Sequence, residues 1–426
     1  MEPAGPLDGK APTASAGRPL RPGDLDLSDP DLYVARGGAP HDYLAMLRRE
    51  DPVHWQPPPE TPRTRSPIER GYWVLTRHAD CVAAARAPDL FSSSARGPFL
   101  FDLEEDGLTG VRCLLIGQDP PHHTRLRSRI EEELTPQRAK ELEPGLRERI
   151  GALVGRVAPR GSGDLVGDLA AELPLLLLGE LLGIPGPELA RLRGWAMQLV
   201  GADDRELSRG ADAMEAATQL WLGFHELGET QRQRPDTWLG RLAQTGIHGP
   251  GLSGTELDDL CLLLLVAAHE PLRHAATHVV RLLLEHPEPY ARVRTDPDRH
   301  LPGVIEETLR YASPVLGCAR TATADTEIGG RRIRAGDKVV LSYASANRDE
   351  AQFGDPMRFD PAREPNPHLG FGCGEHGCLG ADLARMALGA FLREVLTRLP
   401  ALEAAAPPRF QRSCVLAGIR ELRVRW

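Results

Sequence analysis

The sequence predicts a mainly α-helical fold with a small β-rich region, an α+β arrangement in which helices dominate. Helical patterning prevails from Pro121 to about Pro314, and short strand-like segments separated by glycine turns follow Tyr311. No interior stretch rich in Pro, Gly or Ser divides the 426 residues, which indicates one large globule. We therefore expect residues 1–28 to form a disordered arm and residues 29–426 to form a single domain.

Composition excludes several classes of partner. The chain has 41% hydrophobic residues and a net charge of -9, so it can bury a core but offers no positive field for nucleic acid. The N-terminus lacks the features of a secretory signal, and the most apolar runs, 173–184 and 260–268, are shorter than the ~20 residues that cross a bilayer. Seven irregularly spaced cysteines do not suggest a disulfide framework. We expect a cytoplasmic protein with reduced thiols and no membrane partner.

The first part of the chain is predicted to mix helices and strands. Helical patterns cover residues 41–50 and 78–86, and a strand is predicted at residues 72–76. Residues 91–118 show no steady period, so they are predicted to be a long loop. Long loops inside compact domains are usually functional.

The clearest helix begins after Ser253. Ser253 and Glu256 form a capping-box pattern, and the helix is expected to run to about Pro287, roughly 50 Å at 1.5 Å per residue. Residues 260–268 are apolar on all sides, so this helix should pass through the middle of the protein. A final helix is predicted over residues 379–399.

The segment around Cys378 is the most informative part of the sequence. Residues 371–380, FGCGEHGCLG, contain four glycines and precede a helix-forming run. Glycines at this density let the backbone approach a flat ligand closely. A thiol at the start of a helix is stabilised as a thiolate, which is what a thiolate-ligated haem iron requires. A zinc site at Cys373, His376 and Cys378 is the alternative, but no matching second pair of ligands accompanies it.

On these residues the chain resembles the cytochrome P450 family, whose signature F-G-x-G-x-H-x-C-x-G is matched at every fixed position. The resemblance extends from about residue 31 to residue 426 and is to the soluble bacterial members. It implies the cytochrome P450 fold, a helical haem domain with a small β-rich region. It also implies one haem b, with Cys378 as the iron ligand and catalytic residue. Further haem contacts implied by the resemblance are Ala268, Phe371, Gly372 and Gly380.

Two other sets of residues match the family. Glu307 and Arg310 resemble its E-x-x-R motif, and Arg363 matches the third member of a buried network that shapes the haem-binding core. The haem propionates are expected to bind four separate donors, which is more economical than a solvated basic face. These four donors are His123, Arg127, Arg320 and His376.

The central helix departs from the family pattern. Where the family usually has A-G-x-[DE]-T, residues 267–271 are AAHEP. The acid is retained as Glu270, the expected catalytic end of a proton path, but Pro271 lacks the hydroxyl that helps deliver protons to oxygen in the family. Proline at this position also frees the carbonyl of Ala267 and should kink the helix. His269 is predicted to be a polar helix residue without a chemical role.

Apolar residues match the positions that line the family's substrate cavity. They imply a hydrophobic pocket for a small molecule, with loop 91–118 as a lid. These residues are Leu263, Val266, Ala267, Val315, Leu316, Gly317, Val415 and Leu416.

The resemblance implies oxidation of a small, largely apolar natural-product-type molecule with O2 and electrons from a ferredoxin and its reductase. Two alternatives stay open because of Pro271. The enzyme could join C–C or C–N bonds oxidatively without inserting oxygen, or the chain could be a catalytically silent haem-binding protein.

Overall fold

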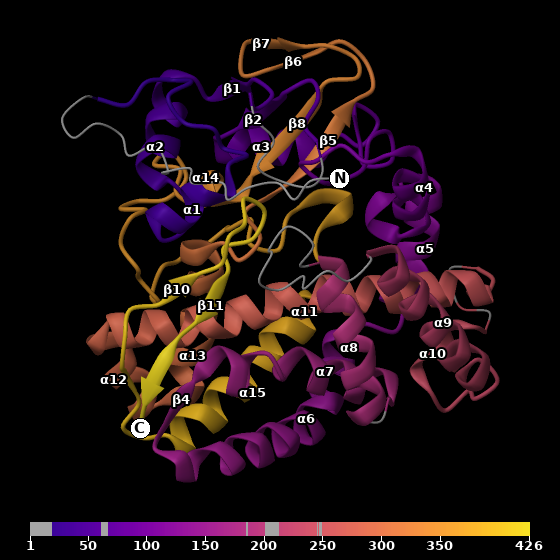
Figure 1. Ribbon diagram of the computed structural model, residues 1–426, viewed down its shortest axis with the longest axis vertical. Helices are drawn as coiled ribbons and strands as arrows, with labels where there is room; N and C mark the ends of the chain where they lie inside the picture. The colour runs from indigo at the N-terminus through magenta and orange to yellow at the C-terminus, as the bar shows by residue number, and fades with distance from the viewer. Residues whose placement is uncertain (1–18, 61–66, 185, 201–212, 245, 247–248) are drawn as a thin grey trace, which may run out of the picture.

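The computed structural model describes residues 19–60, 67–184, 186–200, 213–244, 246 and 249–426, and its architecture confirms the prediction of a mainly helical fold with small sheets (Figure 1). The helices are α1 (Pro30–Arg36), α2 (His41–Glu50), α3 (His78–Ala85), α4 (Glu105–Cys113), α5 (His122–Glu131), α6 (Pro136–Val157), α7 (Leu173–Leu182), α8 (Gly186–Val200), α9 (Ala213–Gln231), α10 (Trp238–Leu242), α11 (Gly254–Glu285), α12 (Pro287–Thr295), α13 (Pro297–Ala312), α14 (Tyr343–Ala346) and α15 (Ala381–Arg398). The strands are β1 (Val53–Gln56), β2 (Tyr72–Leu75), β3 (Phe91–Ser92), β4 (Ser162–Asp164), β5 (Gly317–Ala322), β6 (Thr326–Ile328), β7 (Arg331–Ile333), β8 (Lys338–Ser342), β9 (Glu403–Ala404), β10 (Arg409–Phe410), β11 (Ile419–Glu421) and β12 (Arg423–Arg425).

The main sheet has the strand order β1-β2-β8-β5-β3, with only β2 and β8 parallel among its pairs, and lies in the upper half of Figure 1. It joins segments far apart in the sequence, because β2 pairs in register with β8. The C-terminal strand β12 lies between β4 and β9, and β10 pairs with β11. In Figure 1 the main sheet lies above α11, whereas β10, β11 and β4 lie lower, beside the helices at the left.

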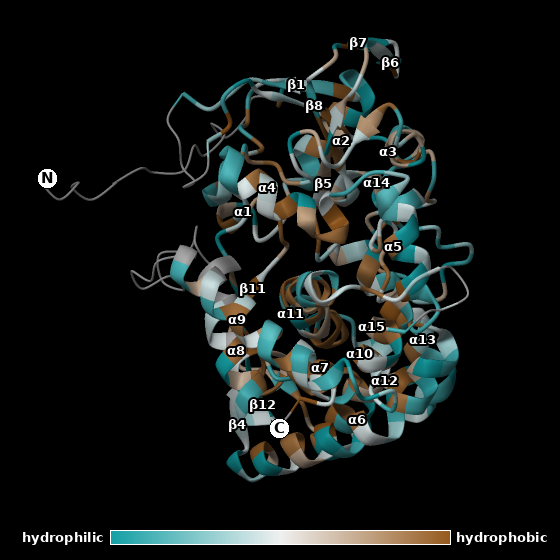
Figure 2. Ribbon diagram, turned by 90° about the vertical axis from the view of Figure 1, so that its right-hand side faces the viewer, coloured by the Kyte–Doolittle hydropathy of each residue, from teal (hydrophilic) through white to brown (hydrophobic). Residues whose placement is uncertain are grey.

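Helix α11 crosses the centre of the molecule, as the sequence predicts, and is seen end-on in Figure 2 with α7, α9 and α15 around it. The capping box is present: the Ser253 side chain accepts the Glu256 N–H, and Glu256 Oε2 accepts the Ser253 N–H at 2.9 Å. The helix extends over 32 residues and continues through Pro271. It supplies a buried axis on which the other helices pack.

The loop predicted at residues 91–118 is not continuous, since it contains β3 and the nine-residue helix α4. Leu108 is the buried residue of α4 and Val111, three residues later on the same face, is half-buried, so the apolar side of this short helix consists of few residues. Its helical state agrees instead with charge placement, with Glu105 and Asp106 in the first turn and Arg112 in the last.

The boundary of the disordered arm is also corrected. Residues 1–18 lie outside the described residues, but Leu25 and Leu27 are buried and pack in a cluster with Tyr33 and Tyr43. The backbone N–H of Gly23 donates to the Tyr43 hydroxyl at 3.0 Å. The short apolar pair holds residues 19–28 against the β-rich region, contrary to the prediction.

In the described part of the chain, no single helix is long and apolar enough to span a membrane. The segments Val166–Leu182 and Gly186–Leu192 meet that criterion only when taken together, and they are bent by 119° at the break between them.

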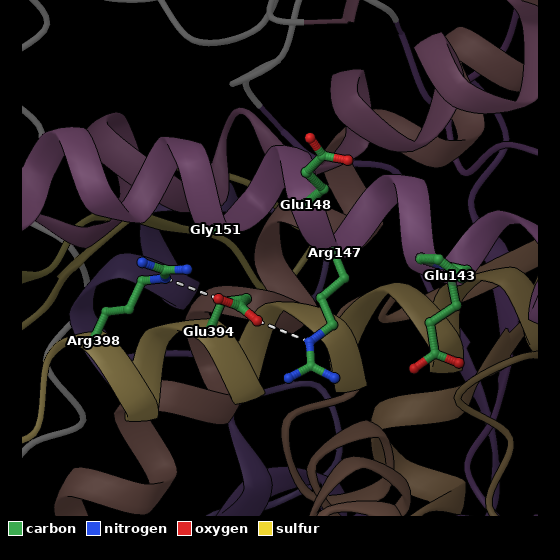
Figure 3. A pocket seen from close by; sticks show the side chains of 7 residues that line it. Glu143, Arg147, Glu148, Gly151, Glu394 and Arg398 are labelled. Atoms are coloured by element: carbon green, nitrogen blue, oxygen red, sulfur yellow. Dashed lines mark hydrogen bonds and ion pairs between the residues drawn. The ribbon is translucent and has the colours of Figure 1, made fainter.

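Helices α6 and α15 pack closely along their length, and Figure 3 shows the ion pair that joins them next to a second one within α15. Glu394 on α15 accepts from Arg147 on α6 at 2.8 Å and from Arg398 at 2.9 Å. A Cβ atom at Gly151 would lie 3.0 Å from both the Glu394 carboxylate and the Arg398 guanidinium. Glycine at position 151 therefore lets the Glu394 and Arg398 side chains lie against α6. The charged cavity beside it is lined by residues of α6 and α15 and results from the packing of these two helices.

The predicted Glu307 network is present, and its central pair of Glu307 and Arg310 is completely buried. Glu307 and Arg310 form a bidentate pair at 2.7 and 2.8 Å, and neither side chain has accessible surface. Arg363 Nε lies 3.3 Å from Glu307 Oε1, and Asn366 Nδ2 donates to Oε2 at 3.1 Å. Arg310 also donates to the carbonyls of Asn347, Pro356 and Arg358. The network ties α13 to the irregular segment 347–368.

Glu307→Ala is expected to lower the free energy of unfolding by about 3–5 kcal/mol, because the guanidinium of Arg310 is left buried without its counter-charge. Glu288→Ala is the matched control, since its carboxylate and its partner Arg292 are both exposed on α12, and its loss should cost about 1 kcal/mol or less. Denaturant unfolding of both variants measures the difference. Equal losses of stability would contradict the role given to the buried network.

Candidate haem site

The Cys378 loop is closed by its own backbone. The Cys378 N–H donates to the Phe371 carbonyl at 2.8 Å, and the Gly377 N–H donates to the Gly374 carbonyl at 3.0 Å. Gly372 and Gly374 have φ values of 64° and 70°, in the left-handed region that favours glycine. A Cβ atom at Gly374 would also lie 2.2 Å from the carbonyl oxygen of residue 85. The glycines that the sequence singled out are thus needed for the turn itself.

The Cys378 thiol lies just before α15, whose N-cap is Gly380. Burial raises the pKa of this thiol, although part of the residue stays accessible. The Gly380 N–H and the guanidinium groups of Arg127 and Arg385 act in the opposite direction and favour the thiolate. A fully ionised sulfur here needs a further positive partner, and an iron ion would supply it.

Three of the four expected propionate donors come close to the Cys378 loop or to one another. The rings of His123 on α5 and His376 lie 4.1 Å apart, centroid to centroid. Arg127, one helical turn after His123, donates to the Gly377 carbonyl at 2.7 Å. Arg320 on β5 is buried and donates to the carbonyl of the preceding residue.

The two imidazoles are held neutral beside the guanidinium groups. Burial, followed by the charge of Arg127, lowers the pKa of His123 to about 4. Burial, followed by the charge of Arg320, lowers the pKa of His376 to about 3. Both ring nitrogens of His123 are buried without a hydrogen-bond partner among the described residues. Such a cationic, partly unsatisfied set suits a ligand that carries carboxylates.

A serine cluster that the sequence analysis missed supports His376. The Ser93 hydroxyl lies 3.1 Å from His376 Nε2. Asp119 accepts from the Ser93 N–H at 2.7 Å and from the hydroxyls of Ser92 and Ser94 at 2.5 and 2.7 Å. Burial raises the pKa of Asp119, but these bonds outweigh it, and the net shift is downward. The run of three serines before a DPPHH segment is the signal that could have shown this contact.

The candidate substrate residues come from three segments. Ala267 on α11 is exposed, and the residues around it on that helix, Leu263, Val266 and Ala268, are half-buried, so one side of the apolar half of α11 stays accessible. Val315 forms an isolated β-bridge with Leu416, and the Leu316 N–H donates to the Val415 carbonyl at 3.0 Å. The segment with Val315 and Leu316 is thus in direct contact with the segment that carries Val415 and Leu416.

Two of the candidate substrate residues belong to the core or to the main sheet. Leu316 is 5% exposed and packs in a core cluster with Cys414 and Ala417. Gly317 pairs with Ser342 in the main sheet, where a Cβ atom would lie 2.5 Å from the Leu341 carbonyl oxygen. Neither side chain position is free to contact a ligand without movement of the sheet or core.

Glu270 is not a free carboxylate. It is buried and accepts from Arg273 at 2.5 and 3.0 Å, and it lies 3.0 Å from His269 Nδ1 and 3.2 Å from His274 Nε2. Burial raises its pKa, but the hydrogen bonds from the two histidines and the charge of Arg273 carry the pKa well below its ordinary value. Glu270 is therefore a permanently ionised group, which is a poor carrier of protons.

The donor set fits haem b: a thiol before a helix, two left-handed glycines beside it, and cationic groups next to an unsatisfied imidazole. In the described part of the chain, no three His, Cys, Asp or Glu side chains are grouped so that they could hold a metal ion. A thiolate-ligated porphyrin iron needs only one protein ligand of this kind.

Comparisons with known proteins agree with this geometry. A family model described as Cytochrome P450 matches residues 229–412. Linalool 8-monooxygenase of Pseudomonas putida is 38% identical, over 94% of this chain and 98% of the relative. Steroid C26-monooxygenase of Rhodococcus jostii (strain RHA1) is 35% identical, over 99% of this chain and 88% of the relative. The solved structure of a Mycobacterium marinum cytochrome P450 in complex with pseudoionone matches with a TM-score of 0.85 at 33% identity, covering 96% of this chain and 100% of that one.

Proposed function

Because the chain belongs to the cytochrome P450 family, and is thus an oxidoreductase, we propose that it is a monooxygenase acting on a small, largely apolar natural-product-type molecule with O2 and electrons from a ferredoxin. The observation that carries the proposal is the glycine-shaped Cys378 loop, closed by the bond from the Cys378 N–H to the Phe371 carbonyl. It presents a thiol beside the N-terminus of α15, where a thiolate is favoured.

We propose that Cys378 would ligate the iron of haem b and that His123, Arg127, Arg320 and His376 would bind its propionates. When bound, haem supplies the activation of O2, which thiolate donation promotes. The protein holds the ligand sulfur, neutralises the propionates and keeps two imidazoles uncharged as hydrogen-bond partners. Further contacts are proposed at Ala268, Phe371, Gly372 and Gly380.

An apolar substrate is proposed from the lining of α11 and of the C-terminal loop. Leu263, Val266 and Ala267 offer only hydrocarbon on the accessible side of the helix, and the bridge between Val315 and Leu416 places two more apolar residues together. Such a surface orients a ligand by its shape, and the burial of apolar surface on the ligand and the protein favours binding. Two relatives named for linalool and for a steroid support this class of molecule.

Oxidative coupling without oxygen insertion is the second candidate, and Pro271 is the observation that favours it. The residue lies on α11 one turn after Ala267, at the position where a hydroxyl would be expected to help supply protons. If proton supply were slow, a substrate radical could combine with a second site before oxygen is inserted. A catalytically silent haem protein has no observation in its favour.

The electron donor is proposed to dock beside the Cys378 loop. A cleft there is lined by Arg86, Arg127 and Gly374, together with Glu131 and Glu375. Arg127 pairs with Glu131 at 2.8 Å, so Arg86 is the arginine of this cleft that is proposed to attract an acidic ferredoxin. A ferredoxin reductase would supply that ferredoxin.

Cys378→Ser is expected to abolish the thiolate-type band of the reduced carbon monoxide spectrum, because the hydroxyl is a far weaker donor to iron. Cys373→Ser, five residues earlier in the same loop, should retain the band. The absorption spectra of the two purified variants make the comparison. Survival of the band in Cys378→Ser would show that another residue ligates the iron.

Arg86→Glu should slow reduction by an acidic ferredoxin severalfold at low ionic strength, and the difference should shrink as salt is added. Arg292→Glu is the control, because this exposed arginine on α12 pairs only with Glu288 and does not line the cleft. Stopped-flow reduction of both variants measures the effect. Equal rates would place the docking site elsewhere.

Product formed under ¹⁸O-labelled O2 should contain one labelled oxygen atom if the enzyme is a monooxygenase. In that case Pro271→Thr should raise the product formed per electron on poor substrates and change little with the native one. If the enzyme couples radicals instead, the product should carry no label and should be dehydrogenated or joined. In that case Pro271→Thr should divert part of the product to a hydroxylated form. Mass spectrometry with an electron count separates the two functions.

A further inference from the structure

A buried lysine, Lys338 on β8, binds the segment between β3 and α4. Its side chain is 1% exposed, and its Nζ donates to the carbonyls of Leu100 and Phe101 at 3.0 and 2.8 Å. The same nitrogen lies 2.8 Å from Asp102 Oδ1. An ammonium group has three N–H donors, so three consecutive residues of this segment use all of them. The chain at residues 100–102 is therefore wrapped around one buried charge.

Asp102 supplies the counter-charge of this lysine. Burial lowers the pKa of Lys338, and the hydrogen bond and the charge of Asp102 act against that shift. Burial raises the pKa of Asp102, but the bonds from Lys338 and from the Glu69 N–H outweigh it, and the net shift is downward. Arg96 Nη2 also donates to Asp102 Oδ1, at 2.5 Å. The pair resists separation, because moving either group away would leave a buried charge without its partner.

Backbone bonds fix the same segment at both ends. The Ala319 N–H, on β5, donates to the Pro98 carbonyl at 2.8 Å, and the Asp102 N–H donates to the Pro67 carbonyl at 2.8 Å. Strands β5 and β8 are neighbours in the main sheet. Residues 98–102 are therefore attached to this sheet twice, by the backbone of Ala319 and by the side chain of Lys338.

The attached segment also reaches the candidate substrate residues. Leu100 is buried in one cluster with Leu316 and Cys414. Phe101 and Val415 are both partly buried and both pack against this cluster. The part of the predicted lid that meets the apolar wall is thus the part that Lys338 holds.

We propose that Lys338 is a positioning residue for substrate binding, which holds residues 98–102 so that Phe101 closes one side of the apolar pocket beside Val415. The inference rests on the monooxygenase function proposed above. Lys338 acts through the loop, and Phe101 is the residue that would contact the ligand. A lid that is already ordered in the free protein loses little conformational entropy when a ligand binds, so the affinity for an apolar molecule is higher.

The test compares Lys338→Met with Arg48→Met in purified, haem-containing protein, with decanol as the apolar probe. Arg48 on α2 is also a buried cation, and it donates to Glu350 at 3.0 Å and to the Ser345 carbonyl at 3.2 Å, on and after α14. The dissociation constant of decanol, read from the spin-state shift, should rise about tenfold in Lys338→Met and stay within about twofold in Arg48→Met. Phe101→Ala should weaken binding about as much as Lys338→Met.

Two further measurements separate positioning from structural damage. The reduced carbon monoxide spectrum of all three variants should equal that of the wild type. In the wild type, decanol should slow amide hydrogen exchange in residues 98–103. Without decanol, the same amides should exchange at least about tenfold faster in Lys338→Met than in the wild type, while those of α11 should not change.

Each opposite result overturns the proposal. Unchanged affinity for decanol in Lys338→Met, an equal loss in Arg48→Met, or no protection of residues 98–103 by decanol in the wild type would each show that Lys338 does not set a lid over the ligand. A failure of the proposed function is distinguishable. In that case decanol would still protect residues 98–103, but the wild type would form no labelled product under ¹⁸O-labelled O2.

Discussion

The buried carboxylate of Glu307 is the constraint on which the haem-binding region depends. Through Arg310 it reaches the carbonyls of Asn347, Pro356 and Arg358, and through Asn366 it holds the segment that precedes the Cys378 loop. The Leu369 N–H donates to the Asn347 side chain at 2.6 Å, so the loop leaves this segment in a defined direction. A charge without accessible surface fixes the backbone because any displacement would leave it unpaired.

The two halves of helix α11 differ in polarity. The first half, after the capping box, presents hydrocarbon and suits an apolar ligand, while the second half holds His269, Glu270 and Arg273 in a buried polar cluster. Pro271 lies at the boundary between them. In the described part of the chain, the second ring nitrogen of His269, two residues before Pro271, is buried and has no hydrogen-bond partner.

Local signals in the sequence predicted those features that depend on local physics. The capping box at Ser253, the helix before Glu50 and the glycine turn around Cys378 follow from backbone geometry and periodicity, and all three are present. Long-range contacts could not be predicted in this way. The bond between Ser93 and His376 spans 283 positions, and the bond between Arg273 and Gln411 spans 138. The family was recognised from the spacing of its motifs, and that spacing does not itself say which residues are in contact.

The C-terminal hairpin of β10 and β11 contacts both the apolar residue Val315 and the buried polar cluster of α11. It contributes Leu416 to the apolar wall, while its Gln411 side chain and Ile419 carbonyl hold Arg273, and Gly418 lies so close that a Cβ atom would be 2.8 Å from the His274 ring. A substitution in this hairpin that moves Leu416 would therefore also disturb the groups that hold Arg273. The loop is constrained from two sides at once, by its apolar bridge to Val315 and by the buried charges of α11, which leaves it little room to change.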